Sequence, residues 1–290
     1  MNDIIITEKT IDVRKVFEKK NPGLAKLIPG FVYSYIRKLI HESENNSILF
    51  TNKDKFGFEF VKACLEQLKA KINVIGEENI PLSGKQILIS NHPLGGYDGL
   101  ALMDMIGRKR KDFLSLSNDL LMVLPNLRPL FVPVNKHGSN LEYMKILNKT
   151  FEDENIILIF PAGLVSRKIN GKIQDLEWKN TFLNRAIRNK RDIIPVYVEG
   201  RNSNRFYNIS NIRKKLGIKA NIEMFFLVDE MYRQINKPIS IYVDKPIPYS
   251  FFDNRMTKRE WIQTIRDYVY QLKDNTNGTF EQFIEQNKKN

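Results

Sequence analysis

Residues 86–99, QILISNHPLGGYDG, constrain the fold of this chain more than any other stretch. An apolar run at 87–89 leads into a turn that holds Asn91, His92 and two glycines, and an apolar-periodic segment begins at Leu100. This order predicts a buried strand, a glycine-rich loop and the start of a helix. Because α/β proteins place their chemistry in loops beyond the carboxyl ends of strands, His92 is a candidate catalytic residue.

A carboxylate, Asp98, lies six positions after His92. On a continuous helix that spacing points the two side chains to different faces, so they meet only if the loop folds back between them. Gly95 and Gly96 permit this fold, because glycine takes positive φ at little steric cost. In such a pair the carboxylate fixes the imidazole tautomer, and the other ring nitrogen accepts a proton from a hydroxyl. Since the chain has no G-x-S-x-G motif, the residues favour direct attack by an acceptor hydroxyl over an acyl-enzyme.

A structural interpretation of the same pair has about equal weight. Asp98 is well placed as the N-cap of a helix that begins at Gly99, and His92 would then bond backbone at the strand end. The local pattern alone leaves both interpretations open.

Four blocks of the sequence, in this order, resemble those of the glycerolipid (lysophospholipid) acyltransferase superfamily, the PlsC-like enzymes. They are NHPLGGYDG at 91–99, LFVPVNK at 130–136, FPAGLVSRK at 160–168 and IIPVYVEGRNS at 193–203. An ordered set of blocks is far more specific than any one of them. The resemblance implies an acyltransferase that moves a fatty acyl group from a thioester donor, acyl-carrier protein or acyl-CoA, to a hydroxyl, with no other cofactor.

The blocks depart from the commonest pattern in three ways. Five residues, not four, separate His92 from Asp98, and Ala162 stands where many members have glutamate. The second block has Asn135 and Lys136 near the place of the usual arginine. These departures resemble the haemolysin-like subgroup, which includes enzymes that acylate amino-acid-derived lipids. The resemblance therefore implies a single-chain lyso-lipid acceptor, amino-acid-derived or lysophosphatidic acid, in membrane lipid biosynthesis.

The resemblance also implies roles for individual residues. His92 takes the hydroxyl proton, Asp98 supports the imidazolium, and backbone amides of the glycine loop stabilise the oxyanion. Arg167 holds the anionic group of the acceptor, because a guanidinium grips phosphate or carboxylate bidentately. Taken without the resemblance, Arg167 is better explained as a surface ion pair. The expected substrate-binding residues are Gly95, Gly96, Lys136, Gly163, Ser166 and Arg167.

The charge of the chain predicts an anionic partner. The formal net charge is +13, and residues 179–219 hold eleven bases against two acids. A membrane surface or an acidic carrier protein would suit that segment. No apolar run approaches the ~20 residues of a spanning helix, and the start MNDIIITEKT lacks the features of a signal peptide. We therefore expect a peripheral protein on the cytoplasmic face of the inner membrane.

Cysteine and histidine usage narrows the chemistry further. The chain has one cysteine, Cys64, so it cannot form a disulfide with itself. Three histidines and one cysteine give no metal-ligand spacing, so we expect no metal.

Strand patterns alternate with helical patterns from residue 72 onward, which predicts an α/β fold with a largely parallel central sheet flanked by helices. We divide the chain into an N-terminal helical, membrane-interfacial segment (1–71), an α/β acyltransferase domain (72–273) and a polar C-terminal tail (274–290). In the first segment Val32, Tyr35 and Ile36 lie beside bases, as in an interfacial helix. Core packing explains the same stripe equally well.

The alternative to an enzyme is a basic peripheral protein that binds anionic membrane or nucleic acid. Its histidine and aspartate would serve only the loop, and the bases and aromatics at 201–207 would permit stacking on nucleobases. No nucleic-acid fold signature accompanies them, so we expect no nucleic-acid partner.

Overall fold

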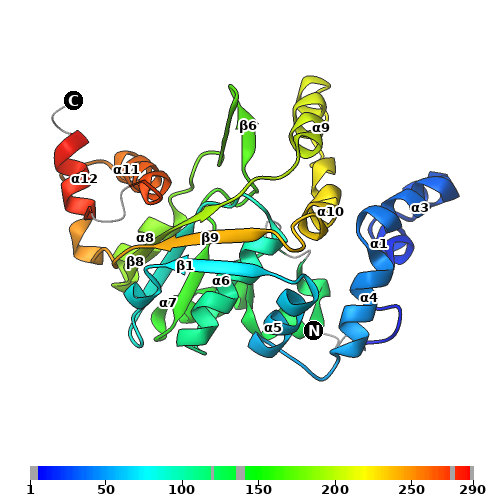
Figure 1. Ribbon diagram of the computed structural model, residues 1–290, viewed down its shortest axis with the longest axis horizontal. Coiled ribbons are helices and arrows are strands. Elements are labelled where there is room, and N and C mark those ends of the chain that lie inside the picture. Colours follow the sequence, from blue (N-terminus) through cyan, green and yellow to red (C-terminus); the bar gives the residue numbers. More distant parts are fainter. Residues whose placement is uncertain (1–5, 119–120, 135–140, 275–277, 288–290) are drawn as a thin grey trace.

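A seven-stranded sheet forms the centre of the computed structural model, which describes residues 6–118, 121–134, 141–274 and 278–287 (Figure 1). In spatial order its strands are β1 (Lys71–Ile75), β9 (Pro238–Val243), β8 (Asp192–Glu199), β2 (Gln86–Ser90), β5 (Ile156–Ile159), β3 (Phe113–Ser117) and β4 (Phe131–Pro133). Among these described strands all neighbours are parallel except β8 and β9. The predicted α/β class with a largely parallel sheet is confirmed.

Strand β2 lies in the middle of this sheet and leads directly to His92. All five of its residues are buried, and it pairs in parallel with β5 on one side and β8 on the other. The Asn91 side chain extends the pairing by one step, because its amide exchanges two hydrogen bonds with the backbone of Val198, at 2.7 and 2.9 Å. The start of the loop that carries His92 is thereby fixed to the sheet.

Helices cover both faces of the sheet. One core cluster joins Leu88 of β2 to α5 (Phe58–Gln67) and α6 (Gly96–Lys109). The other joins Ile87 and Ile89 to α8 (Thr181–Asn189), α11 (Lys258–Gln271) and α12 (Phe280–Asn287). Successive strand residues point to opposite faces, so the continuous apolar run of β2 fills both cores. Full burial of each such side chain contributes about 1.5–3 kcal/mol.

The remaining elements are mostly short. The helices are α1 (Val13–Lys20), α2 (Pro22–Leu27), α3 (Gly30–Leu39), α4 (Glu42–Thr51), α7 (Leu141–Glu152), α9 (Asn204–Lys215) and α10 (Phe226–Tyr232). The 3-10 turns are η1 (Glu77–Asn79), η2 (Leu121–Val123), η3 (Pro125–Leu130), η4 (Ile222–Phe225) and η5 (Tyr249–Phe251). A separate hairpin consists of β6 (Arg167–Ile169) and β7 (Lys172–Gln174).

The first four helices lie together at one end of the molecule, next to α10 (Figure 1). Their apolar residues divide between two environments: Tyr33 and Leu39 are buried, whereas Leu27, Phe31 and Tyr35 are exposed. At the other end of the chain, α12 buries Phe280, Phe283 and Ile284 against α11. The segment expected as a polar tail therefore adds to the core. The three-part division of the chain stays a prediction.

Candidate active site

His92 and Asp98 meet across the loop that joins β2 to α6. His92 Nδ1 lies 3.0 Å from Asp98 Oδ1. Gly95 makes the bend, with φ +85°, and α6 begins at the next residue. Asp98 therefore lies in the first turn of α6, where its side chain reaches back to the imidazole. The sequence-based expectation that Asp98 caps a helix starting at Gly99 is wrong, because Gly95 is the N-cap.

Asp98 serves the loop and the imidazole at the same time. Its side chain is fully buried, and its second oxygen, Oδ2, accepts the backbone N–H of Leu94 at 2.8 Å. The Oδ1 atom and His92 Nδ1 are both buried, and neither hydrogen-bonds to any further group among the described residues. Oδ2 therefore holds the loop, as the structural interpretation expects, and Oδ1 faces the imidazole, as the catalytic interpretation expects.

The rest of the imidazole ring faces a different environment. The ring of Phe160, at the end of β5, stacks on it with centroids 3.8 Å apart and planes tilted by 21°. The His92 side chain is 17% exposed, and no hydrogen bond to Nε2 is found within the described part of the chain. One nitrogen is thus engaged by a carboxylate while the other is available, as a general base requires.

A second carboxylate, Asp175, holds the backbone at His92. Its Oδ1 accepts the N–H of His92 at 3.2 Å and the hydroxyl of Ser166 at 2.5 Å, and its Oδ2 accepts the Trp178 indole N–H at 2.9 Å. Ser166 also donates its backbone N–H to the carbonyl of His92 at 2.7 Å. Burial raises the pKa of Asp175, although these hydrogen bonds partly offset the shift. Sequence analysis did not single out this residue.

Arg167 does not present its guanidinium to an acceptor. Its side chain is 2% exposed and pairs at 3.0 Å with Glu223, which is fully buried. The Nη1 atom donates to the carbonyls of Val165 and Ser166, and the guanidinium lies 5.1 Å from the centroid of the Phe206 ring. A buried charge needs such compensation, and these partners engage the guanidinium within the fold. In the structure this residue joins β6 to α9 and η4, and its predicted contact with the acceptor stays a prediction.

The other predicted substrate-binding residues have varied surroundings. Ser166 is buried and engaged by Asp175, and Lys136 lies outside the described residues. A Cβ atom on Gly95 would come within 3.3 Å of Leu227, and one on Gly96 within 3.3 Å of Met231 Sδ. Helix α10 thus covers the glycine loop closely. Backbone stabilisation of an oxyanion by this loop stays a prediction.

Gly163 lies beside a lysine that sequence analysis did not single out. It has φ +65°, and a Cβ at this position would be 3.2 Å from the ammonium of Lys179. Lys179 is exposed, and its ammonium forms no ion pair among the described residues. Its backbone N–H donates to the carbonyl of Pro161, the residue that follows Phe160. A free cation therefore lies close to the strand end that carries the stacked ring.

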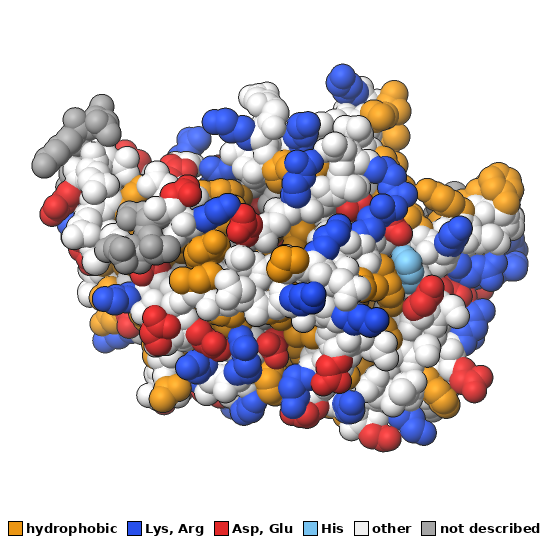
Figure 2. Space-filling model, viewed as in Figure 1, with side chains coloured by type: hydrophobic (Ala, Val, Ile, Leu, Met, Phe, Trp, Pro, Cys, Tyr) orange, Lys and Arg blue, Asp and Glu red, His pale blue; other side chains and the backbone are white. Residues whose placement is uncertain are grey.

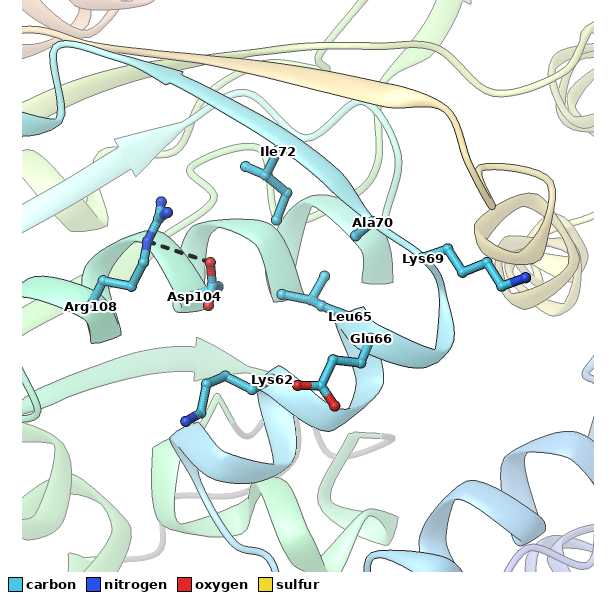
Figure 3. Close-up of a pocket in the computed structure, with 8 residues that line it drawn as sticks. All are labelled: Lys62, Leu65, Glu66, Lys69, Ala70, Ile72, Asp104 and Arg108. Carbon is cyan, nitrogen blue, oxygen red and sulfur yellow. Dashed lines mark ion pairs between the residues drawn. The ribbon is translucent and has the colours of Figure 1, made fainter.

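An open hollow elsewhere on the molecule is unrelated to this site. Figure 3 shows it between α5, β1 and α6, where Arg108 pairs with Asp104 at 3.6 Å. It is lined by Lys62, Leu65, Glu66, Lys69, Ala70, Ile72, Asp104 and Arg108, none of which contacts His92. Within the described ranges no cluster of three or more histidine, cysteine or acidic residues could hold a metal ion. No helix in those ranges is long and apolar enough to cross a bilayer.

Comparison with known proteins decides the family. The model of a family described as acyltransferase matches residues 15–279. The chain belongs to this acyltransferase family. The resemblance to the PlsC-like superfamily is thereby confirmed, and the non-enzymatic alternative is set aside. The match begins within α1 and ends just before α12.

Two curated relatives are similar over nearly their whole length. One, from Bacteroides thetaiotaomicron, is a lyso-glycine lipid O-acyltransferase that is 46% identical over 264 residues, which cover 90% of this chain and 97% of the relative. Another, from Phocaeicola vulgatus, has the same name and is 45% identical over 264 residues, 90% of this chain and 95% of its own. Among solved structures, the 1-acyl-sn-glycerophosphate acyltransferase PlsC of Thermotoga maritima aligns with 17% identity and a TM-score of 0.48, over 90% of this acyltransferase and 98% of that chain.

Proposed function

We propose that this acyltransferase esterifies a hydroxyl of a single-chain lyso-lipid with an amino-acid head, of the glycine class that its relatives' names give. The observation that carries the proposal is the 46% identity to a lyso-glycine lipid O-acyltransferase over almost the full length of both chains. The departures from the commonest acyltransferase blocks support the same class over lysophosphatidic acid.

The geometry of the loop supports a one-step transfer. His92 Nε2 removes the proton of the acceptor hydroxyl, while Asp98 stabilises the imidazolium through Nδ1. The oxygen forms a bond to the thioester carbonyl carbon, and collapse of the tetrahedral intermediate breaks the carbon–sulfur bond. The imidazolium then returns its proton to the departing thiolate. Products are an ester and a free thiol, on either acyl-carrier protein or coenzyme A.

Lys179 replaces Arg167 in this proposal as the cation that meets the acceptor. The head of an amino-acid lipid carries a carboxylate, and an ammonium attracts it as a point charge. Lys179 is exposed and lies beside Gly163, three residues after the ring that stacks on His92. The Lys179→Met substitution should raise KM for the acceptor and leave kcat nearly unchanged.

The acceptor and the exposed apolar residues of the N-terminal helices together support a peripheral location on an anionic membrane, on the cytoplasmic face where the acyl donors are found. Leu27, Phe31 and Tyr35 are exposed at successive turns of α2 and α3. Such residues, beside Lys26, Arg37 and Lys38, suit the boundary between head groups and acyl chains.

The proposal is tested with purified enzyme, a lyso-glycine lipid in detergent micelles, and either acyl-carrier-protein or CoA thioester as donor. Thiol release and mass spectrometry of the lipid product should both report turnover, with lysophosphatidic acid a poorer acceptor. General base catalysis raises the rate about a hundred- to ten-thousand-fold. The kcat of His92→Ala should therefore fall at least about a hundred-fold, while the protein stays folded. Equal turnover by His92→Ala, or no diacylated product with either donor, would exclude the proposal.

A further inference from the structure

Helix α9 ends in an exposed apolar group at a distance from the catalytic loop. We call residues 212–219 the α9 tip. In it Leu216 is 69% exposed and Ile212 is 56% exposed, and the chain turns at Gly217, with φ +68°, to bring Ile218 to the surface beside them. In Figure 1 this end of α9 stands out from the body, on the far side of α10 from the sheet. Apolar side chains clustered at one projecting point indicate an interaction site.

The charge around these apolar side chains has one sign. Lys214, Lys215 and Lys219 are exposed in the α9 tip, and the sequence has no acidic residue between Glu199 and Glu223. Figure 2 shows basic and apolar side chains side by side over the end of α9. An anionic surface with an apolar interior complements this pattern.

The fold holds the α9 tip rigidly. Arg213 donates from Nη1 to the carbonyl of Ile218 at 2.7 Å, and the backbone N–H of Ile218 donates to the carbonyl of Arg213. The same guanidinium pairs through Nε with buried Glu223 at 2.7 Å. Because Glu223 also pairs with Arg167, the α9 tip is fixed to the β6–β7 hairpin. Little conformational entropy is then lost when it binds.

The other end of α9 is attached to the catalytic loop. Asn202, just before the helix, donates its amide to the carbonyl of Pro93 at 3.1 Å, and Phe206 packs against Val165. A helix of 12 residues is about 18 Å long. Whatever the α9 tip binds is therefore held about one helix length away from the loop that carries His92.

We propose that the α9 tip inserts Leu216 and Ile218 into an anionic lipid bilayer and is a second membrane contact beside the N-terminal helices. This inference rests on the proposed function, in which the acceptor is a membrane lipid. A bilayer is favoured over an acidic carrier protein, because a stable protein interface needs about 800 Å² from each partner and the α9 tip offers only the side chains of one helix end. A bilayer requires no matching shape. Contact at two separate points would hold the catalytic loop at a fixed height and angle over the lipid.

The test compares a double variant of the tip, Leu216→Ser with Ile218→Ser, with Leu82→Ser in the otherwise native chain. Leu82 is 75% exposed and lies in the turn before β2, at the opposite end of that strand from His92, so it is a matched control. Sedimentation with phosphatidylglycerol-containing vesicles measures binding directly. The double variant should bind at least about ten-fold more weakly, because burial of one leucine alone is worth that much. Leu82→Ser should bind like the wild type.

A fluorescence variant gives a second, independent readout. The only two tryptophans of the chain, Trp178 and Trp261, are buried, so Leu216→Trp adds the one exposed indole. Its emission should shift to the blue when anionic vesicles are added and not when acyl-carrier protein is added. Vesicle binding of the double variant at the wild-type level, or no blue shift, would overturn the inference. A blue shift with the carrier protein alone would overturn it in favour of carrier docking.

Activity separates failure of this inference from failure of the proposed function. For the double variant, the ratio of turnover on acceptor in vesicles to turnover on acceptor in micelles should fall about ten-fold. If no variant and no wild-type protein acylates any acceptor, the proposed function fails, and vesicle binding still decides the role of the α9 tip.

Discussion

Replacing Asp98 by asparagine isolates the charge of the carboxylate, because the two side chains have nearly the same shape. The wild-type oxygen Oδ1 lies 3.0 Å from His92 Nδ1, and Oδ2 accepts the N–H of Leu94. In the variant the amide oxygen keeps the Leu94 hydrogen bond, so the NH₂ group faces Nδ1. The imidazole must then accept at Nδ1 and carry its proton on Nε2, which is the wrong tautomer for a base.

The size of the effect follows from the distance. Two unit charges 3.0 Å apart attract by about 5.5 kcal/mol at an effective dielectric constant near 20. This energy develops only when the imidazolium forms, so its loss raises the barrier to the chemical step. The cost of desolvating the two charges reduces this attraction. We therefore expect kcat to fall about 10³–10⁴-fold, toward the upper end of general base contributions. KM for both substrates should change less than about three-fold, because neither side chain is assigned to binding.

Initial rates of thiol release, with the donor and the acceptor varied in turn, measure both constants, and circular dichroism with urea unfolding verifies the fold. Asp98→Ala is the companion variant. It also removes the acceptor of the Leu94 N–H, so it should lower stability by about 1–3 kcal/mol in addition to activity. A kcat for Asp98→Asn within ten-fold of the wild type would show that the pair serves only the loop.

Three further predictions follow from the structure. Phe160→Ala removes the ring that stacks on His92, so kcat should fall about three- to ten-fold with KM unchanged, as steady-state rates would show. Arg191→Ala leaves five backbone carbonyls without the buried guanidinium, so urea unfolding should report a loss of about 3–5 kcal/mol, and a loss below 1 kcal/mol would contradict this. Burial raises the pKa of the Cys64 thiol to about 12. The native thiol therefore keeps its proton while the unfolded one loses it, so stability contributed by Cys64 falls from about pH 9 upward, and iodoacetamide at pH 8 should label only denatured protein.

Several features of the site were readable in the sequence because they are local. His92, Asp98 and two glycines lie within seven residues, and a bend at positive φ on Gly95 brings the two side chains together. Other local signals in the sequence mark a turn and a helix start. Asn170 and Gly171 form the positive-φ turn of the β6–β7 hairpin, as that dipeptide often does, and Ser203 caps α9.

The roles of Arg167 and Asp175 depend on residues far away in the chain. Arg167 pairs with Glu223, 56 positions later, and Asp175 bonds the backbone of His92, 83 positions earlier. A sequence shows that an arginine or an aspartate is present but does not show which groups surround it after folding. No local pattern reveals that Arg167 is buried against Glu223.

Short-range periodicity and glycine backbone freedom were enough to predict the parallel sheet, the strand that leads to His92, and the close approach of His92 and Asp98. Which cations remain free in solvent depends on the folded arrangement of the chain. Folding buries Arg167 and Arg213 around one acid, and leaves Lys179 and the lysines of the α9 tip in solvent. The reason is physical: the cost of burying a charge is set by the groups that surround it in space, and chain order does not specify them.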